Sequence, residues 1–157
     1  MQSNMKVGAV LYFTPSQNLR IPFESLQKKT DVPLAFFPLM EKRTNTTRVD
    51  TNAELLEWIR GAALDAVLWW YFDITPGELS IIKQEQPSCR HVLYNWDDPY
   101  VWTSQPDWNE KVQLLDGAVI TCEETQGRYS ALGVKCCAVA FPGFSKLLDD
   151  EDDIAPN

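Results

Sequence analysis

The sequence has very little histidine, because His91 is the only one among 157 residues. None of the cysteines form a CxxC pair; they are Cys89, Cys122, Cys136 and Cys137. Zinc sites are usually built from cysteine and histidine at such spacings, so no zinc site is predicted. A Ser-His-Asp triad would require an exposed histidine, but His91 lies inside an apolar, strand-like run and is predicted to be a satisfied core residue.

Long hydrophobic runs are also missing. No apolar stretch approaches the roughly 18 residues that a membrane helix needs, so no membrane span is predicted. The first residues, MQSNMKVGAVLYF, lack a basic region before their apolar run, and we interpret them as leading into a first strand. Three of the four cysteines lie in apolar, strand-like runs, which predicts buried free thiols and a cytoplasmic protein.

Glycine is scarce, with seven residues in the chain. There is no GxGxxG after the first apolar run and no GxxxxGK[ST] anywhere, so the fingerprints of dinucleotide and P-loop nucleotide sites are absent. No cofactor is predicted on these grounds.

Positive charge is scarce relative to negative charge, and the formal net charge is −8. Five of the 22 acidic residues lie in residues 149–153 (DDEDD), which leaves 17 acidic against 14 basic residues elsewhere. No stretch combines clustered Lys and Arg with aromatics, so nucleic-acid binding is not expected. We predict one domain over residues 1–145 and a disordered acidic tail over residues 146–157.

Short apolar runs alternate with amphipathic segments along the rest of the chain. The runs predict strands at residues 7–13, 33–40, 66–72, 90–94, 117–122 and 134–141. Helices are predicted at residues 21–29, 51–64, 75–86, 106–115 and 123–132, and a loop at 41–50. Such alternation is typical of an α/β protein, so we predict a Rossmann-like, three-layer α/β/α fold with a mostly parallel sheet of about six strands. The prolines near residues 33–40 favour an edge position for that strand.

Local signals mark several helix ends. Thr75-Pro76-Gly77-Glu78 has an N-cap residue, a proline at the first helical position and an acid at the third. Thr51 followed by Glu54 predicts a second capping box. Gly133 is predicted to end the helix before it as a left-handed cap.

In a parallel sheet, ligands bind at the carboxyl ends of the strands, near the point where the strand order reverses. The residues that follow each strand are therefore the expected positions of ligand contacts. With the common order 3-2-1-4-5-6, the first and fourth strands would flank this crevice. Candidate ligand-binding residues on these grounds are Thr14, Tyr71, Asp73, Asn95, Trp96, Tyr100, Glu123 and Glu124.

The stretch YNWDDPY, residues 94–100, is the most unusual of these strand ends because Asp97 and Asp98 are adjacent acids. They are candidates for metal ligands, for a catalytic base, for a clamp on sugar hydroxyls, or for an ordinary Asp-Asp-Pro turn. Carboxylates accept hydrogen bonds from hydroxyls and aromatic rings pack on sugar faces, so this combination suits a saccharide. Glu123 and Glu124 also have a simpler interpretation as first-turn acids of a helix.

Four motifs together resemble a known family. They are NWDDP (95–99), DGAVITCEE (116–124), RYSALG (128–133) and FPGF (141–144). In order and spacing, residues 89–145 resemble the N-terminal half of spore-maturation-type (CgeB-like) glycosyltransferases of GT-B architecture. The first 88 residues are similar only in general α/β character.

The resemblance implies an acceptor-side domain that works with a second Rossmann-like domain, supplied in cis or in trans, which holds the nucleotide sugar. It implies no metal, and a role for Asp97 or Asp98 as acceptor ligand or general base. Arg128, which opens the third motif, is included among the substrate-binding candidates.

Two other classes are kept open. The first is a non-catalytic Rossmann-like binding module, in which Trp102, Trp108 and the acidic tail would contact a partner. The second is a flavodoxin-like or phosphotransfer domain. A receiver-like domain of that class would need acids after the first and third strands, but the first strand ends in Thr14-Pro15.

Overall fold

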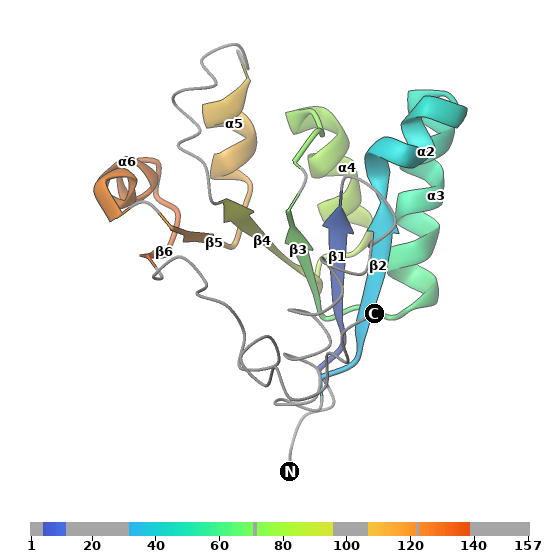
Figure 1. The fold of residues 1–157 in the computed structure, drawn as a ribbon, viewed down its shortest axis with the longest axis horizontal. Helices are drawn as coiled ribbons and strands as arrows, with labels where there is room; N and C mark the ends of the chain where they lie inside the picture. The colour runs from blue at the N-terminus through green and yellow to red at the C-terminus, as the bar shows by residue number, and fades with distance from the viewer. Residues whose placement is uncertain (1–4, 12–31, 71, 96–106, 122, 139–157) are drawn as a thin grey trace, which may run out of the picture.

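The computed structural model describes residues 5–11, 32–70, 72–95, 107–121 and 123–138 (Figure 1). Its strands are β1 (Val7–Leu11), β2 (Leu34–Pro38), β3 (Ala66–Trp69), β4 (Arg90–Asn95), β5 (Gly117–Ile120) and β6 (Cys136–Ala138). The helices in these ranges are α2 (Leu39–Asn45), α3 (Arg48–Gly61), α4 (Pro76–Glu85), α5 (Trp108–Gln113) and α6 (Gln126–Ala131), and a 3₁₀ turn, η1 (Glu123–Thr125), precedes α6.

The six strands form one sheet, and every neighbouring pair is parallel. The predicted Rossmann-like α/β fold is therefore confirmed. The strand order is β2-β1-β3-β4-β5-β6, with β2 and β6 at the edges (Figure 1). The edge position predicted for β2 is correct.

The expected order 3-2-1-4-5-6 is wrong. After β2 the chain crosses back over β1 and adds β3 on its other side, so the order reverses between β1 and β3. Strand β4 is one strand removed from that point. The reversal of strand order expected between the first and fourth strands thus lies between β1 and β3.

One face of the sheet carries the main core. From β2 onward every connection moves across the sheet in the same direction, and right-handed crossovers then place the connecting helices on one face. The core cluster agrees with this, because it unites alternate residues of the strands with residues of α3, α4, α5 and α6. Its largest fully buried side chains include Trp69 from β3, Leu93 from β4 and Tyr129 from α6. A second, smaller cluster of Ala9 and Leu11 lies on the other face of β1, as the two-residue period of a strand requires.

Gly8 explains how α3 can pack across β1. A Cβ built on Gly8 would lie 2.4 Å from Leu64 Cδ1 and 2.4 Å from the ring of Trp58. Only glycine leaves room for both side chains, so this position lets the segment that returns from β2 lie directly on β1.

The segment 41–50, predicted as a loop, is mostly helical. Helix α2 covers Leu39–Asn45, and α3 begins at Arg48, three residues before the predicted start. Thr47 is the true N-cap, and its hydroxyl accepts a hydrogen bond from the Asp50 amide at 3.1 Å. Thr51 is buried one turn inside the helix, where its hydroxyl donates to the Thr47 carbonyl at 2.9 Å. The sequence thus contains two capping patterns, Thr47 with Asp50 and Thr51 with Glu54, and the helix begins at the first of them.

The helix ends predicted at Thr75 and at Gly133 are confirmed. Thr75 and Glu78 form a complete capping box at the start of α4, with Pro76 at the first helical position. Gly133 follows α6 with a φ of +80°. The Gly133 amide bonds the Ser130 carbonyl at 3.0 Å and the Val134 amide bonds the Tyr129 carbonyl at 3.1 Å, which is the Schellman pattern.

The cysteines are less uniformly buried than predicted. Cys89 is buried, Cys136 is half-buried and Cys137 is exposed, and these three are free thiols. Cys137 is exposed because β6 is an edge strand and the side chain of Cys137 points away from the main core cluster. Cys122 lies outside the described residues. Within the described ranges, no helix has the length and apolar character needed to cross a membrane.

Candidate functional site

The residues that follow β3 lie beside the point where the strand order reverses, between β1 and β3. This is the position at which parallel sheets commonly bind ligands. Of these residues, Phe72 and Ile74 are buried in the main core. Asp73 lies between them, and its side chain is 42% exposed. The alternation of inward and outward residues therefore presents one accessible carboxylate at the carboxyl edge of the sheet.

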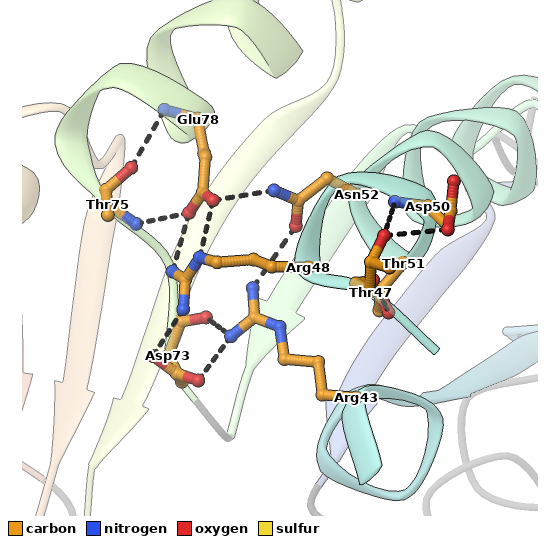
Figure 2. A network of polar contacts seen from close by, with 9 residues as sticks. All are labelled: Arg43, Thr47, Arg48, Asp50, Thr51, Asn52, Asp73, Thr75 and Glu78. Carbon is orange, nitrogen blue, oxygen red and sulfur yellow. Dashed lines mark hydrogen bonds and ion pairs between the residues drawn. The ribbon is translucent and has the colours of Figure 1, made fainter. Parts of the chain in front are cut away.

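Two arginines hold Asp73. Arg43 from α2 donates to both the main-chain carbonyl and the Oδ2 of Asp73 (Figure 2). Arg48 from α3 lies 3.4 Å from Asp73 Oδ1. Arg43 is the more rigidly held of the two, because its side chain is 11% exposed and also donates to Asn52 Oδ1 at 3.2 Å. Asp73 is therefore fixed through its backbone and its side chain together.

Glu78 extends this network to the start of α4. Arg48 binds the carboxylate of Glu78 in bidentate fashion, Nε to Oε1 at 2.6 Å and Nη2 to Oε2 at 2.7 Å (Figure 2). Asn52 and the Thr75 amide each donate to the same carboxylate at 2.7 Å. Burial raises the pKa of Glu78, but the hydrogen bonds from Arg48, Thr75 and Asn52 outweigh it and lower the pKa to about 2.

The other side of the turn is held by a buried lysine. Lys111 of α5 is 3% exposed, and its Nζ donates to the Phe72 carbonyl at 3.0 Å. The ammonium lies 5.0 Å from the centroid of the Phe72 ring and 5.3 Å from that of Trp108. Burial lowers the pKa of Lys111, while Asp107 and Asp73 act in the opposite direction.

The ends of β4 and β5 are joined to α6. Asn95, the last residue of β4, accepts a hydrogen bond from the Thr121 amide through its carbonyl at 3.2 Å. Its side-chain Nδ2 lies 3.3 Å from the hydroxyl of Tyr129, which is fully buried. The side chain of Asn95 is thus turned toward α6, and its main-chain carbonyl bonds the residue that follows β5, so both contacts hold the end of β4 in place.

Five of the sequence-predicted site residues lie among the described residues: Asp73, Asn95, Glu123, Glu124 and Arg128. Asp73 lies in the turn after β3 and Asn95 at the end of β4, and these strands are neighbours. Glu123, Glu124 and Arg128 lie in η1 and α6 after β5, with exposed side chains. The remaining predicted site residues lie outside the described residues; they are Thr14, Tyr71, Trp96, Asp97, Asp98 and Tyr100.

Five residues around Asp73 were not predicted from the sequence: Arg43, Arg48, Asn52, Glu78 and Lys111. The first three lie in or beside the segment interpreted as a loop, and Glu78 was interpreted only as a helix cap. A signal for the lysine was present, because Trp108, Val112 and Leu115 mark a helical apolar stripe and Lys111 falls on it. A charged residue on a buried stripe is itself an indication of a specific role.

Three buried side-chain nitrogens have no hydrogen-bond partner among the described residues: Arg43 Nε, Trp108 Nε1 and His91 Nε2. His91 is fully buried, and its Nδ1 accepts from Trp69 Nε1 at 3.1 Å. The prediction of a core histidine is confirmed, although only one of its two ring nitrogens is satisfied by a described residue. Burial lowers the pKa of His91 to about 4.

Comparison of the chain with models of known protein families and with curated protein sequences finds no match. The fold and the site define a Rossmann-like α/β domain with a six-stranded parallel sheet, in which a carboxylate bound by two arginines follows β3.

Proposed function

We propose that this protein is the acceptor-side domain of a GT-B-like glycosyltransferase of the spore-maturation (CgeB-like) type. In this reaction an acceptor hydroxyl attacks the anomeric carbon of a nucleotide sugar. The bond to the nucleotide diphosphate breaks, and the hydroxyl proton passes to a base. A second Rossmann-like domain, in cis or in trans, holds the nucleotide sugar, and this chain holds the acceptor.

The observation that carries the proposal is the contact between the motifs on which the resemblance rests. Asn95 opens the NWDDP motif, Thr121 belongs to the second motif and Tyr129 to the third. Asn95 bonds both of the others, at 3.2 and 3.3 Å. Segments that are 26 and 34 residues downstream of Asn95 thus support the strand end from which Asp97 and Asp98 continue. A strand end anchored in this way is suited to hold a ligand-binding loop.

Asp73 supports the proposal independently. Sugar hydroxyls are bound by carboxylates that are ionised, fixed and accessible, and Asp73 is held by Arg43 while its side chain is 42% exposed. In the proposed complex Asp73 binds an acceptor hydroxyl. Asp97 or Asp98 accepts the proton of the attacking hydroxyl.

Saccharide binding tests the proposal. The full chain is titrated with UDP-, GDP- and TDP-sugars and with free mono- and disaccharides, and its melting temperature and calorimetric heat are measured. We expect free saccharides to stabilise the protein and Asp73→Asn to abolish this effect. Glu57→Gln on the exposed surface of α3 is the matched control and should bind like the wild type. Wild-type affinity in Asp73→Asn would contradict the role of Asp73.

The catalytic part of the proposal is tested in the complete two-domain enzyme. Asp97→Asn and Asp98→Asn are compared with the wild type in turnover. We expect one of the two variants to lose about 100-fold or more in kcat, the scale of a lost general base. Wild-type turnover in both variants would remove these residues from the mechanism.

The second candidate is a non-catalytic Rossmann-like binding module. One observation favours it. Two arginines and two acids at this part of the carboxyl edge balance in charge and bind one another without a ligand; they are Arg43, Arg48, Asp73 and Glu78. A chain that responds to no saccharide and no nucleotide sugar, but binds the separate second domain, would support this candidate.

A further inference from the structure

Arg48 and Asp73 form a donor–acceptor pair in which each member is fixed by a different third residue. The guanidinium of Arg48 is held by its bidentate contact with Glu78, at 2.6 and 2.7 Å. The carboxylate of Asp73 is held by Arg43, which donates to its Oδ2 and to the main-chain carbonyl of the same residue. Figure 2 shows both guanidinium groups directed toward Asp73. The two members of the pair therefore keep their positions without depending on the contact between them.

The contact between Arg48 and Asp73 is itself long and accessible to solvent. Nη1 of Arg48 lies 3.4 Å from Oδ1 of Asp73, beyond the usual length of a hydrogen bond from nitrogen. The side chains are 41% and 42% exposed, respectively. An exposed ion pair of this length contributes little to the stability of a fold. Attachment of α3 to α4 through Glu78 thus accounts for one side of the Arg48 guanidinium, but not for the side turned toward Asp73.

Both groups have the capacity to bind a ligand. An arginine side chain carries five N–H bonds, and the contacts of Arg48 with the described residues use three of them. One N–H therefore remains on each of its two Nη nitrogens. An ionised carboxylate accepts several hydrogen bonds, and a ligand hydroxyl can replace solvent on the exposed part of Asp73. Because partners already fix both side chains, little rotamer entropy is lost when a ligand binds.

The charge balance of the site favours an uncharged ligand. Two arginines and two carboxylates bind one another here, so together they have no net charge to attract a phosphate or a metal ion. The Arg48–Asp73 pair presents a donor and an acceptor side by side. A vicinal diol has the complementary arrangement, because its two hydroxyls are neighbours and each of them can donate or accept.

We propose that Arg48 and Asp73 bind a vicinal diol, one hydroxyl donating to the Asp73 carboxylate and its neighbour accepting from an Nη of Arg48. The inference deepens the proposed function and rests on it, in that the diol belongs to the acceptor saccharide. The ribose of a nucleoside carries the same diol chemistry, and a carboxylate after a strand of a Rossmann-like sheet can bind it. The experiment therefore distinguishes these two sources.

The experiment uses pairs of ligands that differ by one hydroxyl of a diol. The full chain is titrated with the methyl glycosides of glucose, mannose and galactose, with each of their monodeoxy derivatives, and with uridine and 2′-deoxyuridine. Affinity is measured from the ¹H–¹⁵N NMR signal of the Asp73 amide, and the melting temperature is recorded for each protein. In the wild type the Nε–H signal of Arg48 is followed as well.

Arg48→Lys is the test variant, and Arg60→Lys is its matched control. Arg60 lies on the same helix, its side chain is 38% exposed, and it also contacts two acids, Glu57 and Glu85. Both substitutions retain the positive charge but lose the planar fork of N–H groups. A difference between the two variants therefore reports on the position of Arg48 and not on the loss of a surface arginine.

For the wild type we expect the loss of either hydroxyl of the bound diol to weaken affinity about tenfold, the scale of one hydrogen bond to a charged group. The Nε–H signal of Arg48 should shift on binding. Arg48→Lys should bind the parent glycoside about tenfold more weakly and should discriminate less between it and its deoxy derivatives. Arg60→Lys should retain the affinity and the discrimination of the wild type.

The outcomes separate this inference from the proposed function. Saccharide binding with equal affinity for the parent glycoside and all its monodeoxy derivatives would overturn the inference and leave the proposed function intact. Wild-type discrimination in Arg48→Lys, with or without a lower melting temperature, would show that Arg48 serves only the fold and would also overturn it. Preference for uridine over 2′-deoxyuridine without saccharide binding would support the diol site and overturn the acceptor role. No binding of any of these ligands would overturn both.

Discussion

Three buried or nearly buried basic side chains lie within the main core or at its margin, and each interacts differently. Arg43 is paired with a carboxylate, Lys111 with a carbonyl and aromatic rings, and His91 with the indole of Trp69. Burial disfavours the charged form of a base, and here it is the largest cause acting on both Lys111 and His91. For this reason the pKa of Lys111 and the pKa of His91 are both lowered.

His91 should make the protein sensitive to mild acid. Its pKa is about 4 in the folded state against 6.5 for an unperturbed histidine, so the unfolded state binds the proton first as pH falls. Stability is then complete above about pH 6.5 and is lost as pH falls toward 4, by about 3 kcal/mol for this one group. Urea denaturation at several pH values measures the effect.

The control for that prediction is His91→Asn, which retains an acceptor for Trp69 but does not titrate. The variant is less stable at neutral pH because it leaves a small cavity. Its loss of stability between pH 6.5 and 4 should be smaller than that of the wild type. Equal losses in the two proteins would show that other groups control this pH range. The charged groups whose fields act on His91 are Lys83 and Asp116.

At the scale of single elements, the start of α4 and the crossing of α3 over β1 depend on a few side chains. The capping box of α4 is also the point where α3 is attached, because Glu78 accepts from Arg48 and Asn52 as well as from its own helix. A local capping signal thus has a tertiary function.

Glu78→Gln should destabilise the protein by about 1–2 kcal/mol, because it weakens a helix cap and a bidentate ion pair together. Since the folded pKa of Glu78 is about 2 and its usual value is 4.5, its contribution is present above pH 4.5 and is lost as pH falls toward 2. Glu85→Gln is the control, because Glu85 forms an exposed pair with Arg60 and should change stability by less than about 0.5 kcal/mol. Chemical denaturation at pH 7 compares them.

Gly8→Ala should destabilise the protein by at least about 1–3 kcal/mol, because the new methyl group would overlap Leu64 and Trp58. Gly61→Ala in the last turn of α3 has nothing within 4 Å and should be neutral or stabilising by up to about 1 kcal/mol. Denaturation midpoints of the two variants give the comparison. A neutral Gly8→Ala would mean that α3 does not cross β1 at this position.

At the scale of the whole molecule, the amino edge of the sheet, where the strands begin, differs in chemistry from its carboxyl edge, where the strands end. The amino edge carries ion pairs between Asp116 and both Lys83 and Arg90, and a bond from the Lys6 amide to Asp65. These contacts connect the residues at the beginning of the strands to neighbouring segments of the chain. The carboxyl edge carries the half-exposed Asp73 and the strand end at Asn95.

A saccharide should therefore perturb one edge only. In ¹H–¹⁵N NMR spectra we expect shifts at Asp73, Asn95 and Thr121, which lie at the ends of β3, β4 and β5. The amides of Asp65 and Asp116, at the starts of the same elements, provide the internal control. Perturbation centred on the amino edge would contradict the assignment of the site.

Much of the architecture was predictable from local patterns. The alternation of apolar runs and amphipathic segments predicts the strands, because a strand buried on both faces must be apolar along its length. Thr75, Pro76 and Gly133 predict helix ends because their effects are confined to one turn of backbone. The helical character of residues 41–50 was missed, since α2 and the start of α3 are polar and largely exposed.

Strand order and the surroundings of Asp73 were not predictable in this way. Any of several orders satisfies the same apolar pattern, and the reversal between β1 and β3 depends on whether α3 fits over β1, which Gly8 permits. Arg43, Asp73 and Lys111 are 30 and 38 residues apart along the chain. Hydrophobic periodicity and helix capping depend on residues a few positions apart, so they can be recognised in the sequence. Contacts between residues so far apart form only when the strands have paired and the helices have packed on the sheet.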